Sequence, residues 1–441
     1  MSSIDDQQKQ FILPIGHPQF LAVTAKHSVV ETMKNSNNPA ISSNLRQISE
    51  TLSNIHQQFT TNISESKYLP PEVWTLILST LPAKTLLKFR CVCKSWCSII
   101  DDPDFIQLQF RLCKINSGNN QLLVSLEGLG RNRDKGCLLT VCQPETLQST
   151  GLIFSKSDSY RYRILSSCNG LLLVVQHRPD GSHIELRLWN PCLRKSFLLP
   201  TCPLHNHNCW YLLGFAPDSK DFKVVALTFE KRLGIRPRKM LFVVYSLHDQ
   251  LWTIRNLNTT SVTCIAVLYS LSKALFFRRA AYWLAKNDYQ RDEPTHLGSF
   301  DFEKENIDFL ELPFSLDETG FYRLLFLLGE SLAVFSISKV TSSIWVLEQD
   351  NEKGPWTLWF SGKSTSDAYQ LFFDCIIRHI KLFYIGSDGG FFVCGDKAYN
   401  IASCQVKKLI STPSFYFQLE AYSESLVLFK ESGARDLRDF P

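Results

Sequence analysis

The sequence predicts an α+β protein of more than one domain, in which a small all-α cassette precedes an all-β, propeller-like domain of about six blades. Apolar residues at helical spacing, punctuated by prolines, fill residues 67–113. Nearly all of the chain after residue 114 consists of short alternating stretches that favour strands, and one strand–turn–strand unit returns about every fifty residues. A chain of 441 residues is long enough for two domains and a large core.

Residues 1–66 are expected to form a disordered or weakly ordered tail, because they are rich in Ser, Asn, Gln and Thr and show little periodicity. The acidic start at Asp5 and Asp6, and the apolar patch interrupted by Pro14 and Pro18, do not fit a signal peptide. Most of the 14 cysteines lie inside apolar runs, where a reduced thiol acts as a small apolar residue. The sequence therefore predicts a cytoplasmic or nuclear protein.

Charge and hydropathy argue against two classes of partner. A net charge of +5, scattered over the chain, does not favour nucleic-acid binding. The most membrane-like stretch, Phe321–Ser338, is interrupted by Arg323, Gly329 and Glu330, which favours two strands around a turn over a spanning helix. We therefore expect neither nucleic acid nor membrane as a partner.

Prolines mark the helix boundaries of the cassette. Pro70 and Pro71 suit a helix start with Glu72 in its first turn, and Pro82 ends that helix. Two further helices and a short last one follow, carrying Leu86, Leu87 and Phe89, then Trp96, Ile99 and Ile100, then Phe105, Ile106 and Leu108. A piece this small cannot bury so many apolar faces by itself. It either packs as a cap on the next domain or keeps apolar surface for a partner, and both readings are open.

The β region contains six hairpins of similar design. Further strands lie between them, such as "GLLLVV" and "KVVALTF", and four strands per repeat make a propeller blade. We expect the last strand, Leu426–Phe429, to close the ring by pairing with strands between Leu122 and Val141. Seven blades remain possible, and a large sandwich is the rival fold, although it does not explain the period. The hairpins are aligned near Val141, Trp189, Tyr245, Phe300, Trp345 and Tyr399.

Motifs for covalent chemistry are weak. The glycines of "GLGRNRDKG" lack the spacing of a nucleotide-binding loop. "CPLHNHNCW" brings Cys202, His205, His207 and Cys209 into one short loop, whereas zinc sites usually separate their ligand pairs by a longer arm, so a polar loop is favoured over a zinc site. The basic run "EKRLGIRPRK" is read as a solvated loop rather than a docking site. We predict no catalytic residue, no metal and no cofactor.

The cassette resembles an F-box, the motif that binds the Skp-family adaptor of Skp–cullin–F-box ubiquitin ligases. The similarity lies in "LPPE", in Leu81-Pro82, in "FRCVCKSW" and in the following "DDPDF". The rest is similar to the kelch-like, propeller-forming F-box-associated domain of plant-type F-box proteins, through "SSCNGLLLV", "LWNPCLRKSFLLP" and "GFAPDSKDFKVVAL". The glycine pairs of strict kelch repeats are absent, and the N-terminal extension is not part of the pattern.

This resemblance implies a non-catalytic substrate receptor, with an F-box at 67–113 and a substrate-binding domain at 114–441. Its partners would be the adaptor, cullin through that adaptor, and an unknown protein target. Two alternatives are a scaffold protein that acts outside the ligase, and a propeller that binds glycans or is an enzyme. The expected adaptor face consists of Leu69, Pro70, Pro71, Ile77, Leu78, Leu81, Pro82, Leu87, Arg90, Val92, Lys94 and Trp96.

Target recognition is expected on loops at one face of the propeller, because loops on a rigid β scaffold can vary without disturbing the packing. The longest loops are 201–209, 230–239 and 287–295. Aromatic and arginine side chains are the usual anchors of protein interfaces, which selects Trp210, Arg236 and Tyr289 as candidate substrate-binding residues.

Overall fold

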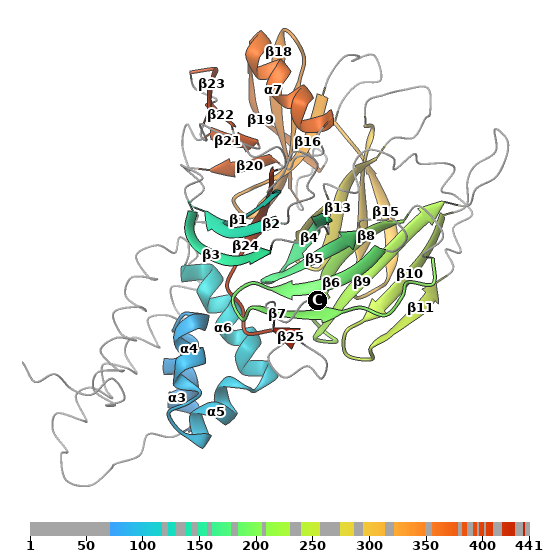
Figure 1. Cartoon of the computed structure of the whole chain (residues 1–441). Coiled ribbons are helices and arrows are strands. Elements are labelled where there is room, and N and C mark those ends of the chain that lie inside the picture. The colour runs from blue at the N-terminus through green and yellow to red at the C-terminus, as the bar shows by residue number, and fades with distance from the viewer. Residues whose placement is uncertain are drawn as a thin grey trace, which may run out of the picture. The chain divides into compact units, whose positions relative to one another are not determined.

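The computed structural model describes residues 71–116, 122–128, 137–142, 149–156, 161–177, 184–204, 209–229, 240–255, 274–285, 294–313, 322–348, 355–377, 382–385, 391–394, 397–400, 403–408, 417–427 and 435–436. The described residues fall into two compact units, one of residues 71–116 with 424–427 and one of the described residues from 122 to 423 with 435–436 (Figure 1). The tail predicted at 1–66 lies outside the described residues.

The first unit contains the predicted cassette as four helices: α3 (Pro71–Ser79), α4 (Ala83–Phe89), α5 (Lys94–Ile100) and α6 (Pro103–Asn116). Helices α3 and α6 both start with proline followed by an acidic residue, Glu72 or Asp104, as the free N–H groups and dipole of a helix start favour. Asp102 caps α6 by accepting hydrogen bonds at Oδ1 from the backbone N–H groups of Asp104 (2.8 Å) and Phe105 (3.2 Å).

The cassette core gathers around Trp96, whose ring centroid lies 4.9 Å from that of Trp74 and 5.3 Å from that of Phe89. The segment after the last propeller strand belongs to the same unit. There Leu426 is buried, and Glu424 forms an ion pair with Lys84 at 2.6 Å. Other fully or nearly fully buried members are Ile77, Leu78, Leu86, Ile100, Phe105 and Ser425.

The second unit consists of six antiparallel sheets among the described residues, five of four strands and one of five. We number them as blades 1 to 6. Blade 1 has the order β24-β1-β2-β3, with β24 (Phe417–Tyr422), β1 (Leu122–Gly128), β2 (Cys137–Cys142) and β3 (Ser149–Lys156). Blade 2 has the order β4-β5-β6-β7-β25, with β4 (Arg161–Cys168), β5 (Leu171–His177), β6 (Ile184–Asn190), β7 (Lys195–Leu198) and β25 (Arg435–Asp436).

Blades 3 to 6 each take four strands in chain order. Blade 3 has β8 (Trp210–Ala216), β9 (Asp221–Phe229), β10 (Met240–Ser246) and β11 (Leu251–Arg255), and blade 4 has β12 (Leu275–Phe277), β13 (Ala280–Ala285), β14 (His296–Asp301) and β15 (Asn306–Glu311). Blade 5 has β16 (Tyr322–Leu328), β17 (Ser331–Ile337), β18 (Thr341–Leu347) and β19 (Trp356–Lys363). Helix α7 (Ser366–Ile377) leads to blade 6, with β20 (Leu382–Ile385), β21 (Phe391–Cys394), β22 (Lys397–Asn400) and β23 (Gln405–Lys408).

The predicted propeller of about six blades is confirmed. Each of the six predicted hairpins forms the third and fourth strands of one blade: β2–β3, β6–β7, β10–β11, β14–β15, β18–β19 and β22–β23. Trp189, Tyr245 and Phe300, the residues that align these hairpins, have no exposed surface. In blades 2, 3 and 4 the sequence period therefore marks a position where a large side chain is buried, whereas Trp345, the aligning residue of blade 5, is only half-buried. The stretch Phe321–Ser338 forms β16 and β17, as predicted.

Ring closure uses a different strand from the one predicted. β24 pairs antiparallel with β1, with Tyr422 opposite Leu122 and Phe417 opposite Glu127. Leu426 lies outside any strand and is buried in the first unit. The prediction was wrong because a short apolar run such as "SLVLF" fits either a strand or a buried segment, and its periodicity does not separate the two.

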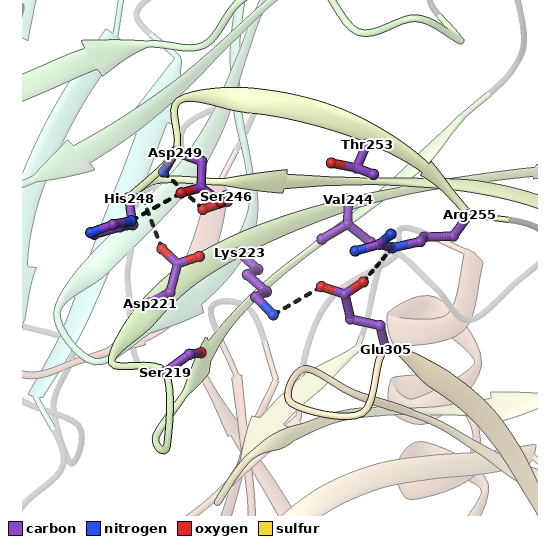
Figure 2. Close-up of a pocket in the computed structure, with 10 residues that line it drawn as sticks. All are labelled: Ser219, Asp221, Lys223, Val244, Ser246, His248, Asp249, Thr253, Arg255 and Glu305. Carbon is purple, nitrogen blue, oxygen red and sulfur yellow. Dashed lines mark hydrogen bonds and ion pairs between the residues drawn. The ribbon is translucent and has the colours of Figure 1, made fainter.

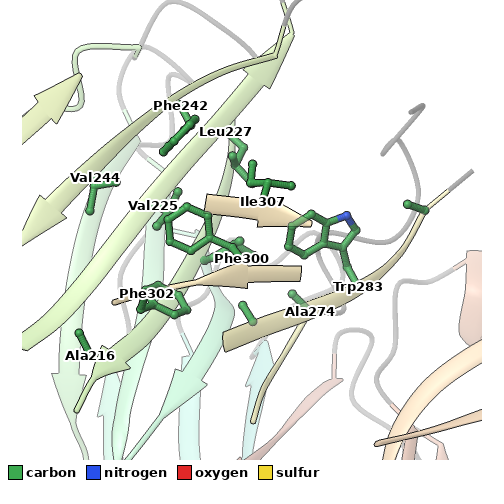
Figure 3. Packing of buried hydrophobic residues seen from close by; sticks show 13 residues of the cluster. Ala216, Val225, Leu227, Phe242, Val244, Ala274, Trp283, Phe300, Phe302 and Ile307 are labelled. Carbon is green, nitrogen blue, oxygen red and sulfur yellow. The ribbon is translucent and has the colours of Figure 1, made fainter. Parts of the chain in front are cut away.

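Aromatic residues fill the space between blades. Between blades 3 and 4, Phe242 packs edge-to-face on Phe300 at 5.7 Å, within a cluster that includes Leu227, Trp283 and Ile307 (Figure 3). A Cβ atom on Gly298 would come within 2.5 Å of the Trp283 ring, so only glycine fits beneath this indole. A second cluster joins blade 5, α7 and blade 6 through Phe335, Phe372, Phe392 and Tyr399.

Candidate functional site

The buried part of the predicted adaptor face lies inside the cassette. Ile77 and Leu78 are 0% exposed, and Leu81 and Trp96 are also buried, so their side chains pack the cassette itself. In this structure they offer an adaptor almost no exposed surface. Leu69 and Pro70 lie outside the described residues, and Pro71 is the first residue of α3.

Arg90 is tied to the cassette by a two-pronged ion pair. Its Nε donates to Oδ1 of Asp101 at 2.6 Å and its terminal nitrogen donates to Oδ2 at 2.7 Å. Asp101 is buried, and the Cys97 thiol donates to its Oδ2 at 3.5 Å. The hydrogen bond to Asp101 raises the pKa of the Arg90 guanidinium, although partial burial acts in the opposite direction. This pair fixes the end of α4 against the end of α5 and so holds the segment between them.

That segment and its neighbours carry the exposed part of the predicted face. Val92 is 54% exposed, which is unusual for a large apolar residue. Lys94 and Pro82 are exposed as well, and Leu87 is half-buried. The sequence pattern could not separate these from the buried residues, because short helices with several apolar faces do not reveal which face is covered.

The candidate substrate-binding residues have different outcomes. Trp210 is the first residue of β8, where it is half-buried and packs against the core shared by blades 3 and 4. Its indole therefore supports the packing rather than projecting from a loop. Arg236 and Tyr289 lie outside the described residues.

The strand ends to which the three predicted loops attach lie at one edge of blades 3 and 4. The turns β8–β9, β10–β11 and β14–β15 contribute Ser219, His248 and Glu305 to a single pocket, so these turns share one edge. Neighbouring antiparallel strands alternate in direction. The start of β8 and the β9–β10 and β13–β14 connections, where the loops 201–209, 230–239 and 287–295 attach, therefore lie at the opposite edge.

The pocket itself was not predicted from the sequence. It has a volume of 310 Å³ and is lined by charged and hydroxyl side chains of blade 3 together with Glu305 from the β14–β15 turn of blade 4 (Figure 2). Lys223 and Val244 lie on the face of blade 3 that carries the Val225 and Phe242 core, because side chains two apart on a strand share a face. The lining residues are Ser219, Asp221, Lys223, Val244, Ser246, His248, Asp249, Thr253, Arg255 and Glu305.

Glu305, one of the lining residues, joins the two blades through its ion pairs. Its Oε1 accepts from Lys223 Nζ at 2.9 Å and its Oε2 accepts from Arg255 Nε at 2.5 Å. Lys223 Nζ also donates to the backbone carbonyl of Phe302 at 3.0 Å. Burial of Glu305 acts to raise the pKa of its carboxyl, but the hydrogen bonds from Lys223 and Arg255 outweigh burial and hold that pKa below its ordinary value of 4.5.

A signal for this pocket was present in the sequence. Asp221 and Lys223 belong to "GFAPDSKDFKVVAL", the stretch that carries the resemblance to the F-box-associated domain. The pattern identified the segment, but only the register of β9 with β10 places Lys223 opposite Ser246 and beside the β10–β11 turn.

The cysteines of "CPLHNHNCW" come together without forming a described metal site. Cys202 is buried and Cys209 packs beside it against Ala226 and Val243. Cys209 donates to the backbone carbonyl of Leu204 at 3.2 Å. His205 and His207 lie outside the described residues. Within the described part of the chain, no group of three or more His, Cys, Asp or Glu side chains is placed to hold a metal ion, and no helix is long and apolar enough to cross a bilayer.

Comparison with known families matches residues 68–108 to the F-box domain and residues 138–424 to the F-box associated beta propeller domain. An F-box/kelch-repeat protein of Arabidopsis thaliana is 23% identical over 348 residues, which cover 74% of this chain and 83% of the relative. An F-box/WD-40 repeat-containing protein of Arabidopsis thaliana is 26% identical over 294 residues, 64% of this chain and 65% of the relative. Among solved structures, TolB from Acinetobacter baumannii aligns over 76% of this chain and 71% of its own at 10% identity, but its TM-score of 0.35 is too low to support an argument.

Proposed function

Because the chain belongs to the F-box proteins that carry an F-box associated beta propeller domain, we propose that it is the substrate receptor of a Skp–cullin–F-box ubiquitin ligase. The cassette would bind the Skp-family adaptor, and through it cullin, while the propeller holds a target protein. The receptor performs no covalent step of its own. It raises the effective concentration of the target near the enzyme that carries ubiquitin.

The observation that carries this proposal is the coincidence of the F-box match with a separately packed unit. The match at 68–108 covers α3, α4, α5 and the start of α6, and these helices form a compact unit distinct from the propeller. This division would let the two binding tasks proceed without disturbing each other's core.

The adaptor surface that fits best contains the exposed residues between and beside the helices. Val92 offers apolar area that no described part of the chain covers fully, and Lys94 is exposed two residues later. Pro82 and Leu87 extend this surface along α4. The ion pair with Asp101 would hold the Arg90 side chain in one conformation at the border of this surface, so that less conformational entropy is lost when the adaptor binds. The buried Ile77, Leu78, Leu81 and Trp96 would support this surface from below.

The proposal is tested by purifying the tagged full chain together with a Skp-family adaptor and cullin, and by repeating the purification with a chain that lacks residues 67–113. We expect adaptor and cullin to co-purify with the full chain and to be absent with the deletion. Adaptor without cullin would instead support the scaffold alternative, and the absence of both would contradict the proposal.

A further inference from the structure

We propose that the pocket between blades 3 and 4 binds a lysine or arginine side chain, presented by an extended segment of a partner protein, on the carboxylates of Asp221 and Asp249. The pocket lies at the edge opposite the strand ends to which the predicted target-recognition loops attach, so the two proposals concern different parts of the blades. That the partner is a ubiquitylation target rests on the proposed function; the ligand chemistry rests on the pocket alone.

The charges of the pocket are unequal. Three carboxylates line it, those of Asp221, Asp249 and Glu305, against the two permanent cations of Lys223 and Arg255. Glu305 forms ion pairs with both Lys223 and Arg255, one through each carboxylate oxygen. Among the described residues, neither Asp221 nor Asp249 forms an ion pair with a lysine or arginine, and Asp249 forms one with His248 only when that imidazole is protonated. With His248 neutral, the pocket carries one excess negative charge, which a ligand with one positive charge neutralises and an anion increases.

Asp221 is the buried member of the receiving pair. It is 6% exposed, and its Oδ1 accepts the backbone N–H of His248 at 3.0 Å, which fixes the direction of the carboxylate. A cation that enters beside a buried carboxylate is screened less by water than one at an open surface, so their attraction is stronger. In Figure 2, Asp221 lies beside His248, and the neighbouring Lys223 points its ammonium toward Glu305.

Asp249 supplies the second carboxylate from the β10–β11 turn. Its Oδ1 lies 3.0 Å from His248 Nδ1, and its backbone N–H donates to Ser246 Oγ at 3.0 Å. The hydrogen bond with His248 lowers the pKa of Asp249, so this carboxylate is ionised at neutral pH. The turn is thus ordered by the same contacts that hold its charge in place.

The remaining lining suits a peptide segment. A volume of 310 Å³ accommodates one long side chain and adjoining backbone, and lies near the small end of the usual range for ligand pockets. The hydroxyls of Ser219, Ser246 and Thr253 can accept from an ammonium or guanidinium, or donate to a peptide carbonyl. Arg255, whose side chain is 47% exposed, uses Nε on Glu305 and can offer its terminal nitrogens to a carbonyl oxygen.

Direct titration of the full chain with small probes tests the proposal. The probes are the methylamides of Nα-acetyl-arginine, Nα-acetyl-lysine, Nα-acetyl-citrulline and Nα-acetyl-glutamate, followed by saturation-transfer NMR. We expect both basic probes to bind, and the citrulline probe, which has nearly the shape of arginine without its charge, to bind about fivefold more weakly or worse. Equal binding of arginine and citrulline, or a preference for glutamate, would overturn the proposal.

Substitutions locate the binding. Asp249→Asn and Asp221→Asn should each weaken binding of the arginine probe about fivefold. Asp308→Asn removes an exposed carboxylate of β15 that does not line the pocket, and it should leave binding unchanged. If Asp221→Asn unfolds the propeller, the Asp249→Asn variant still tests the proposal, because Asp249 is exposed and its substitution should not affect folding. Unaltered binding of the arginine probe by Asp249→Asn would contradict the assignment. Adaptor binding is measured separately on the same wild-type sample, so failure here leaves the proposed function standing.

Discussion

The cassette and the propeller bury tryptophan by different means. Trp96 packs against Trp74 and Phe89, which come from the same short stretch of chain. Trp283 lies in a cluster to which blades 3 and 4 both contribute, with Phe309 of its own blade at 6.4 Å. The cassette core is thus local, apart from the return of Leu426 from near the C-terminus, whereas the core around Trp283 is built from two neighbouring blades.

This difference explains why the two regions respond differently to sequence analysis. A position that recurs in each blade can be recognised in the sequence, because the same kind of residue returns at a regular interval. In a small unit of short helices, apolar residues three or four apart occur on several faces. Their spacing therefore does not distinguish a residue that faces the core from one that faces the solvent. The period therefore predicts most of the buried aligning residues of the propeller, although Trp345 is only half-buried, while only the structure assigns burial in the cassette.

The largest effect is expected from removing the shared C-terminal segment. Truncation after Lys408 deletes β24, which pairs with β1, and also Leu426, which fills the cassette. Blade 1 would be left with an open edge at β1. We expect a loss of about 5 kcal/mol or more in the free energy of unfolding, comparable with the stability of a whole domain.

A second truncation, after Lys430, is the control. It keeps β24 and the cassette segment and removes only the short outer strand β25 from blade 2. Denaturant unfolding followed by tryptophan fluorescence should be close to that of the intact chain. If both truncated chains unfold like the intact chain, then neither ring closure nor the cassette segment contributes as described.

The next largest effect is expected from a substitution in the propeller core, which tests whether the two units unfold independently. Trp283→Ala should destabilise the propeller by about 3–5 kcal/mol, because it leaves a cavity between blades 3 and 4 over Gly298. If the two units pack independently, adaptor binding by the cassette should persist at temperatures where this propeller has begun to melt. Loss of adaptor binding in step with propeller melting would show instead that the two units unfold as one.

A smaller effect concerns the ion pairs that join blades 3 and 4. The pKa of Glu305 is lower in the folded chain than its ordinary value of 4.5, so the folded state binds its proton less readily than the unfolded chain. The resulting stability is present above that ordinary value and is lost as the pH falls through the lower folded pKa. We expect the propeller melting temperature to fall with acidification below pH 4.5.

Glu305→Gln checks this assignment. At neutral pH it should cost about 1–3 kcal/mol, because Lys223 and Arg255 lose a charged acceptor. Below the folded pKa, the variant and the wild type should converge. A difference between them that stays constant from neutral pH into the acid range would show that Glu305 acts through its shape rather than its charge.

The sequence predicted the two-part architecture, the six hairpins and the turn at Gly329, because each depends on local pattern or on repetition. It did not predict that β24 closes the ring, since no local sequence pattern identifies which distant strand pairs with β1. Nor did it predict the pocket, where Asp221, Asp249 and Glu305 meet from two blades. The predicted adaptor face mixed buried residues such as Ile77 with exposed ones such as Val92, because both satisfy the same motif.

The most direct test of the account uses two exposed valines, one in each region. Val92 of the cassette is 54% exposed and Val340, between β17 and β18, is 71% exposed, so aspartate at either position should change the free energy of unfolding by no more than about 0.5 kcal/mol. Calorimetric titration of the full chain with a purified Skp-family adaptor should show Val92→Asp weakening the complex by about 2 kcal/mol. Val340→Asp should bind like the wild type. Equal adaptor affinity for both folded variants would contradict the claim that the cassette surface around Val92 recruits the adaptor.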